Sequence, residues 1–235
     1  MSNMKKPSSH HQSLLKCYND EIDNYEIATD EVGRGCLFGR VYAAAVILPK
    51  DDSFDHSKMK DSKKFTSSKK IQEVSEYIKS NAIAWSIQYE DENMIDMVNI
   101  LQASQMAMHH SINTIIHDKS LVKNPMVKKP ITILADGNYF KPFMLLNTEK
   151  NMLEQIPDIC VVGGDNIYSS IAAASILAKV ERDNYIKDMC VEHPYLVERY
   201  SLDSNKGYAT QKHREGIMKY GVTDWHRNSF NCSWK

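Results

Sequence analysis

Acidic residues follow three short apolar runs of the chain, and this placement suggests a metal site. The acids are Asp30 with Glu31, Asp136 and Asp165. If the runs are strands of one sheet, their ends gather at an edge, where loops carry function. Carboxylates that converge repel one another, so hard cations such as Mg²⁺ or Mn²⁺ would be needed to keep them ionised. Two such ions about 4 Å apart can activate a water and stabilise the leaving oxygen of a phosphodiester.

Adjacent acids on one strand impose a condition on this hypothesis. Neighbouring strand residues point to opposite faces, so Asp30 and Glu31 can share a site only where their strand stops. Gly33 and Gly35 permit such a break. A single aspartate beside a glycine, such as Asp136, is otherwise explained as a turn or cap residue.

The elements that would position these acids follow from hydrophobic periodicity. Strands are predicted over 25–29, 41–48, 84–89, 131–135 and 160–162. Helices are predicted over 67–80, 93–117, 169–190 and 211–220, with 118–130 as a surface loop. This order predicts an α/β fold in which helices cover a mixed sheet.

Length and composition indicate a single globular domain. The chain has 235 residues, of which 42% are hydrophobic and 25% charged, enough to bury a sizeable core. No apolar run reaches 18 residues, and Met1–Gln12 is too polar for a secretory signal. We expect a loosely ordered tail over 1–22 and a catalytic domain over 23–235. Five cysteines without C-x-x-C spacing argue for a reducing, cytoplasmic location and against a zinc site.

Although the net charge is only −1, the chain contains two segments in which basic residues outnumber acidic ones. The segment 57–70 carries Lys58, Lys60, Lys63, Lys64, Lys69 and Lys70, and the segment 206–227 carries Lys206, Lys212, Arg214, Lys219 and Arg227. Such segments on a near-neutral chain can bind phosphates in a defined groove. The alternative is a solvated lysine-rich surface.

Ordered motifs give the carboxylates a context. They are TDEVGRG over 29–35, DSKKFT over 61–66, LADGN over 134–138, Gly164-Asp165 with SIAAASILAKVERD over 170–183, and KGYAT over 206–210 with His213 and HRNSF over 226–230. Together they resemble, in order, the motifs of the type 2 ribonucleases H (the ribonuclease HII family) along nearly the whole chain. The sibling type 3 enzymes usually carry an N-terminal platform domain, for which the residues before the first strand are too few.

The resemblance implies a ribonuclease H-like fold, with a mixed five-stranded sheet flanked by helices and a C-terminal helical segment. It also implies an endonuclease that hydrolyses the RNA strand of RNA–DNA hybrids and cleaves 5′ of single ribonucleotides embedded in duplex DNA. The expected mechanism uses two Mg²⁺ or Mn²⁺ ions and leaves 3′-OH and 5′-phosphate ends. The family's catalytic, metal-binding carboxylates fall on Asp30, Glu31, Asp136 and Asp165.

The resemblance assigns substrate contacts as well. The family's glycine-arginine-glycine turn, whose backbone contacts the ribose 2′-OH, falls on Gly33, Arg34 and Gly35. The tyrosine that packs on the following deoxy sugar falls on Tyr208. Phosphate contacts are expected from Lys63, Lys64 and Lys206.

Three positions depart from the common family pattern: Val32, Arg40 and Ala209, where alanine, proline and glycine are usual. They bear on sugar selection and leave the carboxylates intact. Asp183 is a poorer fourth ligand than Asp165, since about five helical turns separate the two. His213 is either a proton shuttle or a structural histidine.

Two other functions remain open at this point. The chain could be a nucleic-acid-binding relative without catalysis, or a carboxylate-metal phosphohydrolase acting on small esters. The expected partners are RNA–DNA hybrids and duplex DNA with embedded ribonucleotides, with no membrane. We expect a monomer, and no motif supports docking to a replication clamp.

Overall fold

The computed structural model describes residues 13–21, 23–117, 130–147 and 150–230. At its centre is a five-stranded sheet with the order β3-β2-β1-β4-β7. Its strands are β1 (Tyr25–Val32), β2 (Val41–Ile47), β3 (Ala84–Glu90), β4 (Ile131–Asp136) and β7 (Asp158–Val161). The β1–β2 and β2–β3 pairs are antiparallel, whereas β1–β4 and β4–β7 are parallel. The predicted mixed five-stranded sheet is confirmed.

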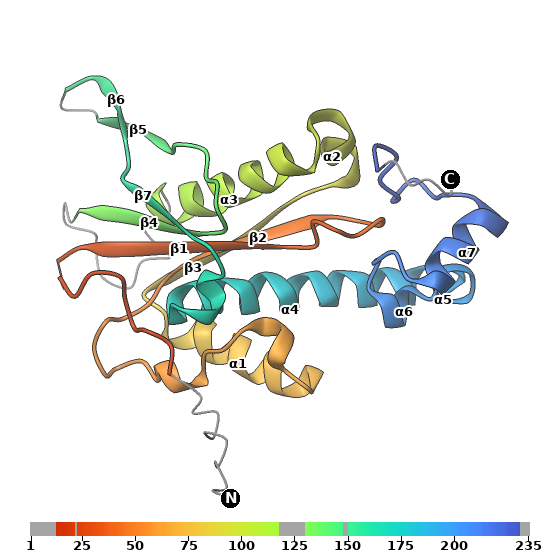
Figure 1. Cartoon of the computed structure of the whole chain (residues 1–235), viewed down its shortest axis with the longest axis horizontal. Coiled ribbons are helices and arrows are strands. Elements are labelled where there is room, and N and C mark those ends of the chain that lie inside the picture. The colour runs from red at the N-terminus through yellow and green to blue at the C-terminus, as the bar shows by residue number, and fades with distance from the viewer. Residues whose placement is uncertain (1–12, 22, 118–129, 148–149, 231–235) are drawn as a thin grey trace, which may run out of the picture.

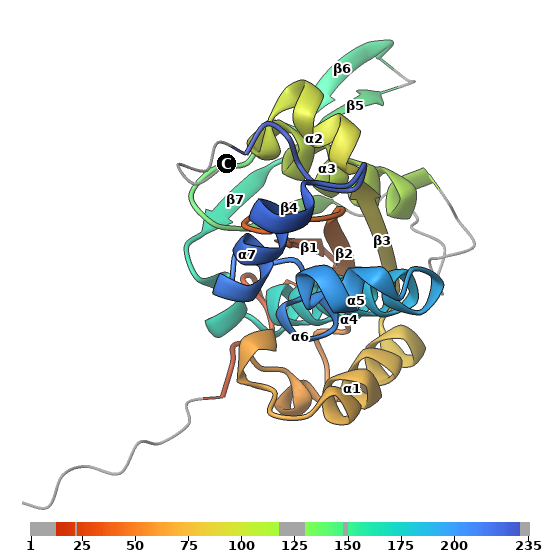
Figure 2. The same ribbon diagram turned by 90° about the vertical axis from the view of Figure 1, so that its right-hand side faces the viewer.

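Helices cover both faces of the sheet (Figure 1; Figure 2). On one face lie α2 (Glu92–Val98) and α3 (Ile100–His117), and on the other α4 (Ser169–Glu192), with α1 (Ser68–Asn81) packed beneath it. The C-terminal helices α5 (Tyr195–Tyr200), α6 (Leu202–Asn205) and α7 (Gln211–Tyr220) gather at one end of the domain. The 3₁₀ turns are η1 (His56–Lys58), η2 (Ser62–Lys64) and η3 (Gly164–Asn166).

Strand β2 shows why the sequence folds this way. All seven of its residues are buried, because helices cover both faces. Ala44 and Val46 belong to the core shared with α4, while Ala43 and Ala45 belong to the core shared with α3. Successive strand residues alternate between faces, so an unbroken apolar run feeds both cores. The three alanines leave room for both helices to approach.

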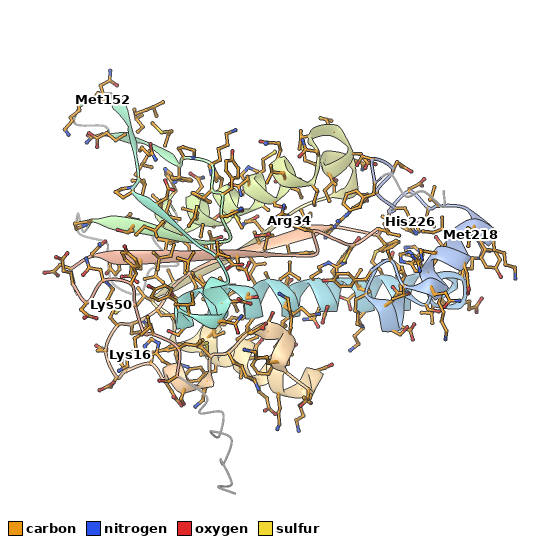
Figure 3. The ribbon with its side chains drawn as sticks, viewed as in Figure 1. Lys16, Arg34, Lys50, Met152, Met218 and His226 are labelled. Carbon is orange, nitrogen blue, oxygen red and sulfur yellow. The ribbon has the colours of Figure 1, made fainter. Side chains whose placement is uncertain are left out.

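One predicted helix differs from the structure, and one hairpin of the structure was not predicted. The predicted helix over 93–117 is interrupted at Asn99, whose φ of 71° ends α2 and starts α3 in a new direction. Within the stretch 139–157 a hairpin forms from β5 (Met144–Asn147) and β6 (Met152–Gln155). Met152 marks this hairpin in Figure 3, where it projects away from the sheet. Of the predicted loop over 118–130, residues 118–129 lie outside the described residues.

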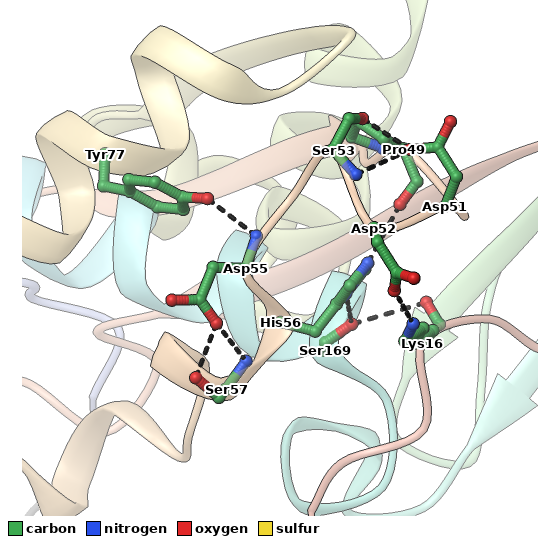
Figure 4. Close-up of polar contacts among 10 residues, drawn as sticks. All are labelled: Lys16, Pro49, Asp51, Asp52, Ser53, Asp55, His56, Ser57, Tyr77 and Ser169. Carbon is green, nitrogen blue, oxygen red and sulfur yellow. Dashed lines mark hydrogen bonds and ion pairs between the residues drawn. The ribbon is translucent and has the colours of Figure 1, made fainter.

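The N-terminal segment is described from residue 13, and it lies against the domain. Leu15 forms an isolated bridge with Tyr168, and the Lys16 ammonium pairs with Asp52 at 2.6 Å. Close by, the His56 ring contacts the Ser169 hydroxyl at 2.7 Å and the Pro49 carbonyl at 3.0 Å (Figure 4). These contacts connect the start of the chain, the segment after β2 and the start of α4.

No helix in the described part of the chain combines the length and the apolar character needed to cross a membrane.

Candidate active site

Asp30 and Asp136 meet because their strands are paired. β1 and β4 run parallel with Thr29 opposite Ala135, so the next residue on each strand is an aspartate. The Asp30 side chain is only 5% exposed, and its Oδ1 accepts the Glu31 N–H at 2.7 Å. Burial, reinforced by the charges of Glu31 and Asp136, raises the pKa of Asp30 well above its ordinary value. A nearby cation would relieve this electrostatic cost.

The prediction that β1 stops before the acidic pair is wrong. The strand runs through Asp30 and Glu31 to Val32 and remains paired with β2 over that stretch. Glu31 is half-buried and forms an ion pair with Arg34, Oε1 to Nη1 at 3.0 Å. Burial raises the pKa of Glu31, the arginine opposes that shift, and Asp136 adds to it. The charge of Asp136 therefore raises the pKa of both acids, although the two are neighbours on one strand.

Asp165 lies on the 3₁₀ turn η3, which follows the strand predicted over 160–162. β7 ends at Val161. The turn is held against β4 because the Gly164 N–H donates to Asp136 Oδ1 at 2.7 Å. A Cβ at Gly164 would lie 2.5 Å from Ile171 Cδ1 and 3.3 Å from Asp136 Oδ1, so any larger residue would have to displace its neighbours. Burial and the charges of Asp61 and Asp136 raise the pKa of the enclosed Asp165 carboxyl.

This donor set fits divalent cations that share their coordination with substrate. Within the described residues, no three acidic, histidine or cysteine side chains enclose a metal ion by themselves. Mg²⁺ sites at phosphate-processing centres commonly use one or two carboxylates, with waters and substrate phosphates completing the shell. Hard carboxylate oxygens that repel one another around Asp136 match that requirement.

Three residues in this cluster were not singled out from the sequence. Ser175 of α4 donates a hydrogen bond that lowers the pKa of Asp30, and its hydroxyl lies 3.0 Å from that of Ser62. Asp61 adds negative charge beside Asp165 while its carboxylate accepts the Lys63 N–H at 2.9 Å. The only advance signal was that all three lie inside the quoted motifs.

The glycine-arginine-glycine turn directly follows β1. The Cys36 N–H donates to the Gly33 carbonyl at 3.3 Å, which closes the turn, and Arg34 and Gly35 at its tip are exposed. A Cβ at Gly35 would meet no atom within 4 Å. Gly33, in contrast, has a φ of 96°, and a Cβ there would lie 2.3 Å from Arg182 Nε. Position 33 therefore requires glycine, because its φ is positive and because Arg182 occupies the space of a side chain. At Gly35 no neighbouring atom occupies that space.

Tyr208 lies beside this turn, although 173 positions separate Gly35 from it in the sequence. Cys36 and Tyr208 form an antiparallel bridge, and the Leu37 N–H donates to the Gly207 carbonyl at 2.8 Å. The tyrosine remains 44% exposed, so its ring is available to a ligand. The structure therefore brings together the turn and the tyrosine named from the sequence.

The candidate lysines border the same region. Lys63 and Lys64 are exposed, and the Lys64 ammonium bonds Asn166 Oδ1, next to Asp165. Lys206 is partly exposed and lies two residues before Tyr208.

Arg227 and His213 are not surface groups. Arg227, counted in the second basic segment, is fully buried and cannot reach a phosphate. His213 is also fully buried, with Nδ1 2.9 Å from the Tyr208 carbonyl and Nε2 3.1 Å from His226 Nε2. These bonds give His213 a structural role. In Figure 3, His226 lies beside the C-terminal helices.

The remaining predicted positions have local explanations. The Arg40 guanidinium lies over the rings of Tyr89 and Tyr185, at 4.0 and 4.6 Å, so its charge is held by aromatic faces. Ala209 is exposed beside Tyr208. Asp183 pairs with Lys179 at 2.5 Å along α4, which is consistent with the preference for Asp165.

Comparison with known proteins identifies the family. The family model described as ribonuclease HII matches residues 27–235. The chain belongs to the ribonuclease HII family. A ribonuclease HII from Bacteroides fragilis is 41% identical over 218 residues, covering 93% of this chain and 94% of the relative. One from Porphyromonas gingivalis is 42% identical over 217 residues, covering 92% and 94%. The chain is thus a ribonuclease H endonuclease of a divalent-metal-dependent family that acts on RNA–DNA hybrids.

Solved structures show the same fold. Ribonuclease H2 from Pyrococcus horikoshii matches with a TM-score of 0.63 and 18% identity, over 88% of this chain and 93% of its own. The ribonuclease HII of Archaeoglobus fulgidus, solved in complex with PCNA, matches with a TM-score of 0.62 and 21% identity, over 88% and 96%. Bst-RNase HIII in complex with Mn²⁺ has a TM-score of 0.59 and 16% identity, over 94% and 69%. These likenesses support the ribonuclease H-like architecture.

Proposed function

We propose that this enzyme cleaves on the 5′ side of single ribonucleotides embedded in duplex DNA, as well as within the RNA strand of hybrids. One observation carries the proposal. Asp30 and Glu31 lie on β1, which leads directly into the exposed turn at Arg34 and Gly35, and Asp136 lies on the paired strand β4. Cys36, which follows that turn, is bridged to Tyr208. A hydrolytic site and a sugar-reading site therefore share one surface.

The hydrolytic part belongs to the four acids. Asp30, Glu31, Asp136 and Asp165 would hold two Mg²⁺ or Mn²⁺ ions, which supply an activated water and stabilise the leaving oxygen. The protein orients the donors: Gly164 restrains Asp136, Ser175 restrains Asp30, and Arg34 restrains Glu31. The products would carry 3′-OH and 5′-phosphate ends.

The sugar-reading part belongs to the turn and the tyrosine. Arg34 and Gly35 present exposed backbone that can approach a ribose 2′-OH, since Gly35 has no side chain to hold the sugar away. The Tyr208 ring would pack on the next sugar and favour one without a hydroxyl. Lys63, Lys64 and Lys206 flank the site and would contact phosphates, which positions the duplex without reading its sequence.

The test uses a DNA duplex with one ribonucleotide, supplied with Mg²⁺ or Mn²⁺. We expect a single cut 5′ of the ribonucleotide, and we expect Asp136→Asn to reduce kcat about a thousandfold, since it removes a charge from the metal site. The asparagine Oδ1 can still accept the Gly164 N–H, so circular dichroism should report an intact fold. Full activity in Asp136→Asn would refute the carboxylate assignment. Binding without cutting by the unmutated protein would favour the non-catalytic alternative.

A further inference from the structure

Two fully buried arginines lie behind the sugar-reading turn. Arg182 comes from α4 and Arg227 follows α7, and both side chains are 0% exposed. An interior guanidinium is costly unless it is hydrogen-bonded. Burial lowers the pKa of Arg227 to about 10, which still leaves it charged at neutral pH. Neither arginine can touch a substrate, so their positions need another explanation.

Arg227 bonds the carbonyl oxygens of the turn itself. Its Nη1 donates to the Gly33 carbonyl at 2.8 Å and to the Arg34 carbonyl at 3.0 Å. Its Nε donates to the Gly39 carbonyl at 2.8 Å. One rigid guanidinium therefore fixes two consecutive peptide groups at the turn and a third where the chain returns toward β2.

This bonding determines the direction of two amide N–H groups. None of the peptide bonds among the described residues is cis, so the C=O and N–H of each peptide plane at this turn point in opposite directions. The Gly33 and Arg34 carbonyls point inward to Arg227, and the N–H groups of Arg34 and Gly35 in the same planes therefore point outward. Among the described residues, neither N–H has an acceptor. Both belong to exposed residues of the turn.

A charged donor on a carbonyl also strengthens the N–H of the same peptide group. Hydrogen bonds in a chain polarise one another, and bonds from ionised donors are stronger than neutral ones. The outward N–H groups of Arg34 and Gly35 are thus both oriented and polarised from behind by Arg227. They are prepared to donate to a hydroxyl oxygen before any ligand arrives.

Arg182 connects the turn to the tyrosine. Its Nη2 donates to the Lys206 carbonyl at 2.8 Å, and its Nε lies 2.3 Å from where a Gly33 Cβ would be. Its Cζ lies 5.8 Å from the centre of the Tyr208 ring. This arginine therefore acts as a spacer between the turn and Tyr208.

We propose that Arg227 is a positioning residue for ribose recognition, which orients the Arg34 and Gly35 amides toward the 2′-OH. The inference rests on the proposed function, because it assumes that these amides read the sugar. Lysine cannot replace the arginine, since a single ammonium lacks the planar fork that spans adjacent carbonyls.

The test measures sugar preference in binding, where cleavage does not interfere. In an Asp136→Asn background with Mg²⁺, the Kd is measured for a duplex with one ribonucleotide and for the same duplex entirely of DNA. Adding Arg227→Lys should reduce the ratio of the two Kd values about tenfold, the loss expected for a misaligned hydrogen bond. The Kd for the all-DNA duplex should stay within about twofold, because phosphate contacts are unchanged.

The matched control is Arg199→Lys, an exposed arginine on α5, which should leave both Kd values unchanged. If the background protein shows no preference for the ribonucleotide, the proposed sugar reading fails. If it shows the preference and Arg227→Lys retains it, the role of Arg227 is refuted. A merely structural arginine would weaken binding of both duplexes equally.

A second measurement keeps the proposal testable if Arg227→Lys does not fold. In the Asp136→Asn protein with Arg227 intact, carbonyl ¹³C shifts are followed during titration with each duplex. The ribonucleotide duplex should move the Gly33 and Arg34 carbonyl signals more than the all-DNA duplex does. Gly39, bonded by the same guanidinium, is the internal reference. Equal changes with both duplexes would refute the proposal.

Discussion

Asp30 is the most constrained acid of the site. Its carboxylate is buried, repelled by Glu31 and Asp136, and steadied by the Ser175 hydroxyl. Asp165 has a similar electrostatic problem at the other side of Asp136, with Asp61 as an additional neighbour. At neutral pH these charges destabilise the native state unless a cation joins them.

Divalent metal should therefore raise the thermal stability of the enzyme. At about 100 times Kd, a ligand that binds only the folded state adds about 2.7 kcal/mol. For a chain of this size that corresponds to a rise in Tm of roughly 5 to 10 °C. Calorimetry with and without Mn²⁺ measures the shift, with Asp136→Asn as the control that should lose most of it. An undiminished shift in that variant would place the bound metal elsewhere.

Two substitutions of Tyr208 should distinguish the contribution of its ring to activity from that of its hydroxyl. Tyr208→Ala should lower kcat/KM at a single embedded ribonucleotide by about 10- to 100-fold, the range for a lost aromatic stacking contact. Tyr208→Phe keeps the ring and should retain most of that activity. Cleavage within a long hybrid should fall less, since every sugar of its RNA strand carries a hydroxyl. Equal losses on both substrates would argue against a role in sugar selection.

At the scale of elements, α4 connects the two halves of the site. Ser175 bonds Asp30 and Arg182 contacts the turn, and the two are seven residues apart on this helix. Seven residues make two turns and about 10.5 Å, so both side chains lie on the same face. The helix sets the distance between Asp30 and the Gly33–Gly35 turn, the two parts of the proposed site. A kink in this part of α4 would change that distance.

At the break between α2 and α3, a substitution by glycine should not lower the free energy of unfolding, whereas glycine within a regular helix lowers it. Asn99 has φ 71° and ψ 163°, a region almost confined to glycine. Asn99→Val should lower the free energy of unfolding by about 1 to 3 kcal/mol, whereas Asn99→Gly should leave it unchanged or raise it. On α3, Asn113→Gly should be destabilising, because its backbone is helical. Urea unfolding measures all three, and a stable Asn99→Val would contradict the strain.

At the scale of the whole molecule, the first and last segments that the structure describes both pack onto the domain. Toward the C-terminus, Asp96 of α2 accepts the backbone N–H groups of Asn228 and Ser229, each at 2.9 Å, which secures the segment that carries Arg227. Toward the N-terminus, the buried Glu26 accepts the N–H groups of Tyr18 and Asn19. The first closure completes the site, whereas the second lies at the start of β1, away from the site.

Removal of residues 1–21 should therefore cost stability without changing the chemistry. The deletion leaves the buried Glu26 with Lys50 but without the two backbone donors, a loss of about 2 to 3 kcal/mol. Lys16→Met, which breaks only the exposed pair with Asp52, should cost less than about 1 kcal/mol. Thermal melting and kcat per folded molecule are the measurements. An unchanged Tm in the deletion would mean that this segment does not stabilise the domain.

The sequence by itself determined the sheet and most helices, and it named the acids of the candidate site. Periodicity is a local signal, so the apolar run of β2 and the helical spacing of α4 were readable without tertiary information. Asp30, Glu31, Asp136 and Asp165 were named from motifs, and the structure places them around paired strands and one turn. The break at Asn99 was missed because apolar spacing continues across it.

Only the tertiary structure showed which buried residues support the turn of the site. Arg227 looked like one more cation of a basic segment, yet it is buried and bonds carbonyls 193 and 194 residues away in sequence. Gly33 looked like a substrate-facing glycine, yet Arg182 fills the space that its side chain would need. Burial and long-range hydrogen bonds depend on which segments the fold brings together, and local residue patterns do not encode them.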